Sequence, residues 1–244
     1  AMILEEGLSM DVLRRVVDSM REAAASAGAS IVTGDTKVVD RGKGDGMFIN
    51  TTGIGIVPEG VSISPKRARP GDKVLVSGSI GLHGMAIMSV REGLEFESPI
   101  RSDSAALHDL VAAVLAAAGD GVHVLRDPTR GGVASALNEI AASCGAGIRL
   151  EETAVPVTEE VQAACEILGF DPLYVANEGR CLIIVSPQAA DAALEAARAH
   201  PLGRDAAVIG VVVDDHQGRV TMRSRIGGLR VVDMMSGEQL PRIC

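Results

Sequence analysis

Four short stretches of the sequence carry residue types that can do chemistry, and the first is Gly34-Asp35-Thr36-Lys37. Gly34 allows close backbone approach, Asp35 can hold Mg²⁺, Thr36 offers a hydroxyl, and Lys37 offers a positive charge to a phosphate. The spacing GxxxxGK followed by Ser or Thr, which defines a P-loop, is absent. The stretch therefore predicts either a phosphate and metal site or a polar turn with a solvated lysine.

The second stretch is DPTRGG, from Asp127 to Gly132, directly ahead of an expected helix. Exposed N–H groups at a helix start, two glycines and Arg130 together favour an anion site. The alternative is a Pro-Gly turn in which Asp127 caps the chain locally.

The third stretch, Asn177-Glu178-Gly179-Arg180, lies between two strongly apolar segments that we expect to be strands. A carboxylate there is a candidate general base, because an apolar flank can raise its pKa toward neutrality. The alternative is a tight turn in which Asn177 and Gly179 take positive φ angles and Glu178 is solvated.

The fourth candidate is Cys244, which ends the segment Leu240-Pro241-Arg242-Ile243-Cys244. Pro241 disfavours a helix, and three upstream glycines could let the segment bend. This pattern indicates a tethered thiol that visits a site and leaves it. The alternative is an ordinary frayed terminus.

The elements that must position these residues follow from hydrophobic periodicity and turn signals. We expect an α+β fold built of α/β layers, with helices on one face of the sheet and a division of the chain near residues 67–72. The last two strands should form a hairpin across the turn 215–218. Helices are predicted over 10–27, with Ser9 as the N-cap, and over 82–91, 104–118, 131–143, 158–168 and 189–199. Strands are predicted over 2–4, 29–33, 47–57, 73–77, 147–150, 173–176, 181–185, 207–213 and 220–223.

Composition restricts the class of protein. Apolar residues make up 47% of the 244 residues and aromatic residues only 2%, so the core must be built from Val, Ile, Leu, Ala and Met. A net charge of −9 argues against nucleic-acid binding, and no apolar run approaches the length of a membrane span. Four cysteines without CxxC spacing, and an N-terminus unlike a signal peptide, predict a cytoplasmic protein with reduced thiols.

Taken together, the motifs resemble those of the HypE-type carbamoyl dehydratases, which help to mature nickel–iron hydrogenases. These enzymes belong to a PurM-like, ATP-using superfamily that includes aminoimidazole ribonucleotide synthetase. The matching pieces cover essentially the whole chain: Ile3 to Gly7, Val32 to Val39, Asp127 to Ala134, Asn177 to Gly179, and Pro241 to Cys244.

The resemblance implies a PurM-like two-domain architecture. Residues 1–69 would be the remainder of an N-terminal ATP-binding domain, 70–230 a C-terminal domain, and 231–244 a tail with the carrier cysteine. Members of the family have a longer first domain, so we expect that the chain begins inside it and binds ATP only weakly by itself.

The resemblance also implies a reaction. Cys244 would receive a carbamoyl group from a HypF-type carbamoyltransferase, and ATP with Mg²⁺ would activate that group so that loss of phosphate leaves a thiocyanate. Glu178 would be the base, and Lys37 would stabilise charge on the phosphate or substrate oxygen. The cyanide would pass to an iron-binding scaffold complex of the HypC–HypD type, and the protein would be a homodimer.

The nucleotide would be bound by Gly34, Asp35, Thr36 and Arg130, with Asp35 also the metal ligand. Two other functions remain open at this point. A sister enzyme, such as a selenophosphate synthetase or a small-molecule kinase, would have no use for the terminal cysteine. A chain that lacks part of its first domain could instead be a non-catalytic carrier or docking module.

Overall fold

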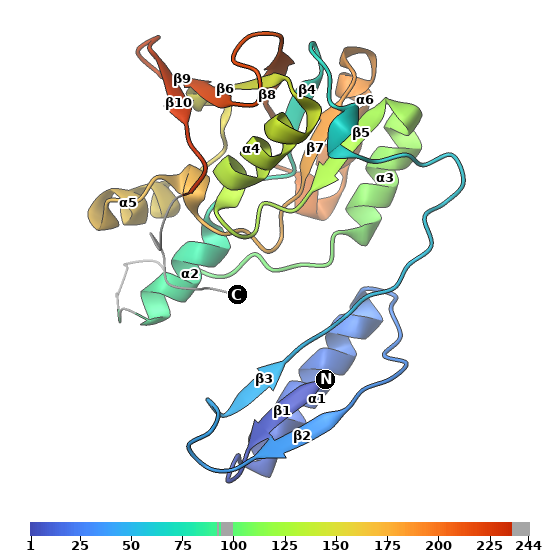
Figure 1. Ribbon diagram of the computed structural model, residues 1–244, viewed down its shortest axis with the longest axis vertical. Helices are drawn as coiled ribbons and strands as arrows, with labels where there is room; N and C mark the ends of the chain where they lie inside the picture. The colour runs from blue at the N-terminus through green and yellow to red at the C-terminus, as the bar shows by residue number, and fades with distance from the viewer. Residues whose placement is uncertain (92, 94–99, 236–244) are drawn as a thin grey trace. The chain divides into compact units, whose positions relative to one another are not determined.

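The computed structural model describes residues 1–91, 93 and 100–235, which form two compact units. The first unit runs from Ala1 to Glu59 and the second begins at Gly60 (Figure 1). Residues 60–69 belong to the second unit, where the Ser64 N–H donates to the His123 carbonyl at 3.0 Å. Among the described residues, no helix is both long and apolar enough to cross a membrane.

The first unit is a small sheet with one helix. Its elements are β1 (Met2–Glu5), α1 (Met10–Ser26), β2 (Thr36–Val39) and β3 (Met47–Ile49). The sheet has the order β2-β1-β3, with β1 parallel to β2 and antiparallel to β3. Ser9 caps α1 as predicted, because its side chain accepts the Asp11 N–H.

Two strand predictions in this unit are wrong: one strand is absent, and the other is shorter than predicted. Residues 29–33 form no strand, and β2 begins at Thr36, where Met2 of β1 offers it a partner. The strand expected over 47–57 ends at Ile49, because its pairing with β1 stops at Met2. An apolar run becomes a strand only where a neighbouring strand can accept its backbone hydrogen bonds.

The second unit holds a larger sheet with helices. Its helices are α2 (Leu82–Arg91), α3 (His108–Ala118), α4 (Gly132–Cys144), α5 (Glu159–Leu168) and α6 (Ala190–Ala199). Its strands are β4 (Lys73–Val76), β5 (Val122–Arg126), β6 (Gly147–Glu151), β7 (Leu182–Val185), β8 (Ala207–Val213), β9 (Val220–Arg223) and β10 (Leu229–Val232). The seven strands have the order β10-β9-β6-β8-β4-β7-β5, and only the β6–β9 pair among them is parallel.

Helices cover both faces of this sheet, so the prediction of one covered face is wrong (Figure 1). Side chains alternate along β4: Val74 and Val76 join a core with Leu137 of α4, whereas Leu75 joins a second core with Leu110 of α3. Helix α6 contributes to the second core. The continuous apolar runs 74–76 of β4 and Leu182–Val185 of β7 are typical of strands buried on both sides.

Three further differences concern strands of this unit. The predicted hairpin between β8 and β9 is wrong, because β6 lies between them. The predicted strand 173–176 is wrong, since Pro172–Tyr174 is a turn of 3-10 helix that starts at a proline. The sequence analysis also missed β5 and β10, which are the two edge strands.

Candidate functional site

In the first unit, the stretch Gly34 to Lys37 is the entry to a strand, and all four residues are exposed. The Asp35 side chain accepts the Thr36 N–H at 2.8 Å, and the Asp35 carbonyl accepts the Met2 N–H at 2.8 Å. Because side chains alternate along β2, Thr36 and Lys37 lie on opposite faces of the sheet. The stretch therefore presents its hydroxyl and its ammonium group to different sides.

Among these four residues, Asp35 carries the one carboxylate that could bind a metal ion. Asp35 uses one oxygen for its local hydrogen bond and leaves the other available. Within the described part of the chain, no group of three His, Cys, Asp or Glu side chains could hold a metal ion. Mg²⁺ is commonly bound through one or two carboxylates together with phosphate oxygens and water, so Asp35 fits as one such ligand.

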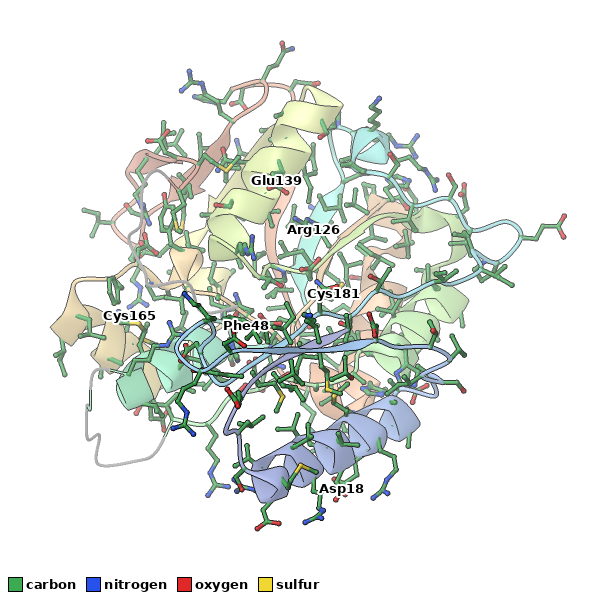
Figure 2. All side chains as sticks on the ribbon, turned by 60° about the horizontal axis from the view of Figure 1, so that its bottom comes forward. Asp18, Phe48, Arg126, Glu139, Cys165 and Cys181 are labelled. Carbon is green, nitrogen blue, oxygen red and sulfur yellow. The ribbon has the colours of Figure 1, made fainter. Side chains whose placement is uncertain are left out.

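Lys37 lies on the sheet face that carries Ile3 and Phe48, since Ile3 pairs with both residues across the strands. In Figure 2, Phe48 and Asp18 of α1 lie on opposite sides of this small sheet, with α1 on the side of Asp18. Ile3 is 43% exposed and Phe48 is 53% exposed. This face, defined here by Ile3, Lys37 and Phe48, is the open face of the first unit.

In the second unit, the DPTRGG stretch shapes the start of α4. Gly131 and Gly132 have φ angles of 68° and 61°, in the left-handed region that favours glycine. A Cβ on Gly132 would lie 2.4 Å from the Leu173 carbonyl oxygen, so only glycine fits there. No side chain caps α4; its first turn is buried, and the Gly132 N–H donates to the Thr129 carbonyl at 3.3 Å.

Asp127 acts locally, as the turn alternative predicted. One of its oxygens accepts the Thr129 hydroxyl at 2.7 Å and the other accepts Arg126 Nη1 at 2.8 Å. Arg126 also donates to Glu139 of α4 at 2.9 Å, and this hydrogen bond is the main reason why the pKa of Arg126 is raised (Figure 2). Arg130 is exposed beside this network.

Asn177 joins the DPTRGG stretch to the turn that carries Glu178. It is fully buried, and its amide nitrogen donates to the Pro128 carbonyl at 3.1 Å and the Val175 carbonyl at 2.9 Å. Its amide oxygen accepts the Gly81 N–H, ahead of α2, at 2.8 Å. The starts of α2 and α4 are thus held to the same side chain. Neither Asn177 nor Gly179 has a positive φ angle, so that part of the turn prediction is wrong.

Glu178 is half-buried, and its Oε1 atom is buried without a hydrogen-bond partner in the described structure. Next to it, a Cβ on Gly179 would lie 1.8 Å from the Asp103 carbonyl oxygen. Arg180 donates from Nε to the Ser79 carbonyl at 2.8 Å and from Nη1 to the Gly179 carbonyl at 2.9 Å. The carboxylate is therefore placed on a tightly packed turn.

The described chain ends over the start of α4. The Tyr174 hydroxyl donates to the Asp233 carbonyl at 3.0 Å, and Asn138 of α4 donates to the Val232 carbonyl at 2.9 Å. The side chain of Met235 lies 3.5 Å from where a Cβ on Gly131 would stand. Cys244 and the predicted mobile arm lie outside the described residues, nine positions after Met235 (244 − 235 = 9).

The cysteines within the described residues have a structural character. Burial is the main cause that raises the pKa of Cys165 to about 11 and that of Cys181 to about 12. Cys165 lies on α5 and Cys181 lies directly before β7 (Figure 2). Cys144 is half-buried at the end of α4. Raised pKa values disfavour the thiolate, which is the reactive form of cysteine.

Sequence reasoning missed a buried ion pair and a buried hydrogen bond between a histidine and a carboxylate. Asp103 lies 3.2 Å from Arg180, and Asp72 lies 2.7 Å from His123. Each pair joins residues far apart in the chain, and no motif or spacing marks them. Asn177 was recognised only as a turn residue, and a fully buried asparagine with three partner segments has no local signal either.

Comparison with protein families divides the chain as the two units do. Residues 1–57 match the family model "AIR synthase related protein, N-terminal domain", and residues 69–223 match "AIR synthase related protein, C-terminal domain".

Individual relatives are closely similar along the whole chain. The "Carbamoyl dehydratase HypE" of Cupriavidus necator is 60% identical over 242 residues, which is 99% of this chain and 69% of that protein. A crystal structure of the hydrogenase maturation protein HypE in complex with ATP superimposes with a TM-score of 0.95 at 51% identity, covering 100% of this chain and 73% of that one. A HypE–HypF complex gives a TM-score of 0.92 at 49% identity, covering 95% and 75%. The chain therefore belongs to the HypE family of carbamoyl dehydratases, among the AIR synthase related proteins.

Proposed function

We propose that the protein converts a carbamoyl group on the Cys244 thiol into a thiocyanate at the expense of ATP, as a source of the cyanide ligands of nickel–iron hydrogenases. The observation that carries this proposal is the path of the chain after β10. Met235 lies against Gly131 at the start of α4, and the positive end of this helix dipole favours a nearby anion such as a phosphate group. Nine residues, at about 3.3–3.6 Å each when extended, separate Met235 from Cys244 and give the thiol reach around that site.

The reaction balances as a dehydration. The carbamoyl oxygen attacks the γ-phosphorus of ATP, ADP leaves, and the oxygen becomes part of a phosphate leaving group. The nitrogen loses its two protons, the C–O bond breaks, and inorganic phosphate departs. The product is a thiocyanate, S–C≡N, on the same sulfur.

Glu178 serves as the base that takes a proton from nitrogen. Its half-buried position on a rigid turn, with one buried oxygen not hydrogen bonded, suits a carboxylate that has to accept a proton. The exposed Arg130 is a donor for phosphate oxygens, and the positive end of the α4 dipole favours their negative charge.

Lys37 stabilises charge on the phosphate or the substrate oxygen, and Gly34 and Thr36 contact the nucleotide. Asp35 would hold Mg²⁺, which supplies charge neutralisation to the phosphate chain when it is bound. These residues are exposed on the first unit, as residues that bind a soluble nucleotide must be.

The partners follow from the same chemistry. A HypF-type carbamoyltransferase supplies the carbamoyl group, and the relative seen in a HypE–HypF complex supports that choice. An iron-binding HypC–HypD-type scaffold receives the cyanide in the cytoplasm. A second copy of the chain contacts Ile3 and Phe48, which are otherwise exposed on the first unit.

The substitution Glu178→Gln tests the reaction, because it keeps the side-chain shape and removes the base. General-base catalysis contributes about 10²–10⁴-fold, so carbamoylated Cys244 should accumulate while thiocyanate formation falls by that factor. Mass spectrometry of the C-terminal peptide, after incubation with the carbamoyl donor system and Mg-ATP, separates the two modifications.

Three results would contradict the proposal. A carbamoyl group found on a Cys244→Ala protein would mean that another cysteine is the carrier. A dehydration rate of Glu178→Gln within about threefold of the parent rate would make Glu178 a turn residue only. Carbamoylation of the parent without any thiocyanate would indicate a carrier module instead of an enzyme.

A further inference from the structure

Asp103 is a buried carboxylate on the segment between α2 and α3, and no motif of the sequence includes it. Its side chain is only 8% exposed, and it forms an ion pair with Arg180, 11% exposed, at 3.2 Å. Neither Asp103 oxygen has a hydrogen-bond partner in the described structure. A buried carboxylate without hydrogen bonds is costly, so its retention requires an explanation.

The geometry around Arg180 explains why Asp103 acts through charge. Arg180 Nε carries a single hydrogen, which it donates to the Ser79 carbonyl, so none remains for Asp103. Arg180 Nη1 donates to the Gly179 carbonyl. The guanidinium thus binds two backbone carbonyls, and Asp103 supplies the negative charge that a buried cation needs.

The same segment also touches the turn directly. The Asp103 carbonyl oxygen lies 1.8 Å from the point where a Cβ of Gly179 would stand, so the two backbones are in close contact. Asp103 therefore contacts Gly179 through its backbone carbonyl and Arg180 through its carboxylate.

We propose that Asp103 is a positioning residue for Glu178, acting through Arg180 and the Gly179 carbonyl. This inference rests on the proposed function of Glu178 as a base. Asp103 itself touches no reacting atom. It holds the guanidinium that binds the carbonyl of the Gly179–Arg180 peptide, directly after Glu178, and thereby the direction from which the carboxylate approaches the substrate nitrogen.

The substitution Asp103→Asn removes the charge and keeps the shape. A misplacement of about 1 Å can lower a rate by about 10²-fold, so we expect kcat for thiocyanate formation to fall by about 10–10²-fold. The KM for Mg-ATP and the extent of carbamoyl loading should stay within about threefold, because Asp103 contacts neither ligand. Asp120→Asn is the matched control, since Asp120 forms an exposed ion pair with Arg67 in the same unit. It should leave both constants unchanged.

A double-mutant cycle tests the route of the effect. If Asp103 acts through Arg180, adding Asp103→Asn to Arg180→Met should lower kcat no further than Arg180→Met alone. Effects that multiply would overturn the proposed route. Asp103→Glu keeps the charge on a longer side chain, and its kcat should fall between those of the parent and Asp103→Asn.

Hydrogen exchange gives a readout that needs no turnover. In Asp103→Asn, the peptide 175–181 should exchange faster, while α6 exchanges as in the parent. A kcat within threefold of the parent value, or unchanged exchange of that peptide, would refute the positioning role. If the parent itself forms no thiocyanate, the proposed function fails, and hydrogen exchange still decides whether Asp103 holds the turn.

Discussion

At the scale of single residues, burial separates structural thiols from reactive ones. The pKa of Cys165, about 11 against an ordinary 9.0, lowers its thiolate fraction at pH 8 by about 10²-fold, and Cys181, at about 12, has still less thiolate. We expect an aromatic disulfide reagent to label both at least about 10²-fold more slowly in the folded protein than in guanidinium. Peptide mapping of the labelled sites measures this difference. Equal rates in the two states would show that the two thiols are accessible.

Glu5 provides a pH-dependent contact in the first unit. Its carboxylate accepts hydrogen bonds from the N–H groups of Gly42 and Gly46. These two bonds lower the pKa of Glu5 below its ordinary value of 4.5, and the bond from Gly42 has the larger effect. A lowered pKa in the folded state stabilises the fold above pH 4.5, and this contribution is lost as the pH falls through the folded pKa. The amide resonances of Gly42 and Gly46 should therefore shift in acid.

The same titration in two variants isolates Glu5. Glu5→Gln should remove the acid shift, because a neutral amide has no proton to gain in this range. Glu6→Gln, at the exposed neighbouring position, should retain it. Retention of the shift in Glu5→Gln would assign it to another group.

Local residue types predicted part of the candidate site. The helix start in DPTRGG lies within a residue of its predicted place, and its two glycines take φ angles that favour glycine, because such preferences act within a few residues. The pairing of Asp103 with Arg180 could not be predicted. It depends on the backbone contact of Gly179 with a segment far away in the chain.

At the scale of elements, the glycines at the two ends of α4 have different roles. Gly132 has φ 61° and no room for a Cβ, whereas Gly145 has φ 74° and nothing within 4 Å. Gly145→Ala should cost about 1–2 kcal/mol of unfolding free energy, from the left-handed backbone alone. Gly132→Ala should cost about 3 kcal/mol or more, because the new methyl group meets backbone carbonyls that cannot turn away. Urea unfolding of the two variants compares them, and similar losses would show that the start of α4 can relax.

Helices were predicted better than strands. Apolar periodicity located α4, α5 and α6 to within about a residue at each end, since a helix makes its own hydrogen bonds. Strands depend on partners from elsewhere in the chain. Residues 29–33 include β-branched side chains but pair with no neighbouring strand in the described structure. By contrast, β10 forms beside β9 although three of its residues are exposed.

At the scale of the whole molecule, the open face of the first unit predicts self-association. Phe48→Asp places a charge where a second copy would bury an aromatic ring, so it should convert a dimer into monomers. Sedimentation velocity measures the change. Ile226→Asp is the control, since Ile226 is 95% exposed in the turn between β9 and β10, and it should leave the dimer intact. A dimer that persists in Phe48→Asp would place the contact elsewhere.

The strand order of the large sheet has a consequence for how the protein is made. β4 lies between β7 and β8, but β7 begins at Leu182, 106 residues after β4 ends at Val76 (182 − 76 = 106). A ribosome that adds about 5–20 residues per second needs about 5–20 s to make that stretch. During this time β4, whose last three residues are fully buried in the folded sheet, has emerged without either neighbour. The nascent chain thus exposes a strand that favours aggregation, and we expect it to depend on a chaperone until β8 leaves the exit tunnel.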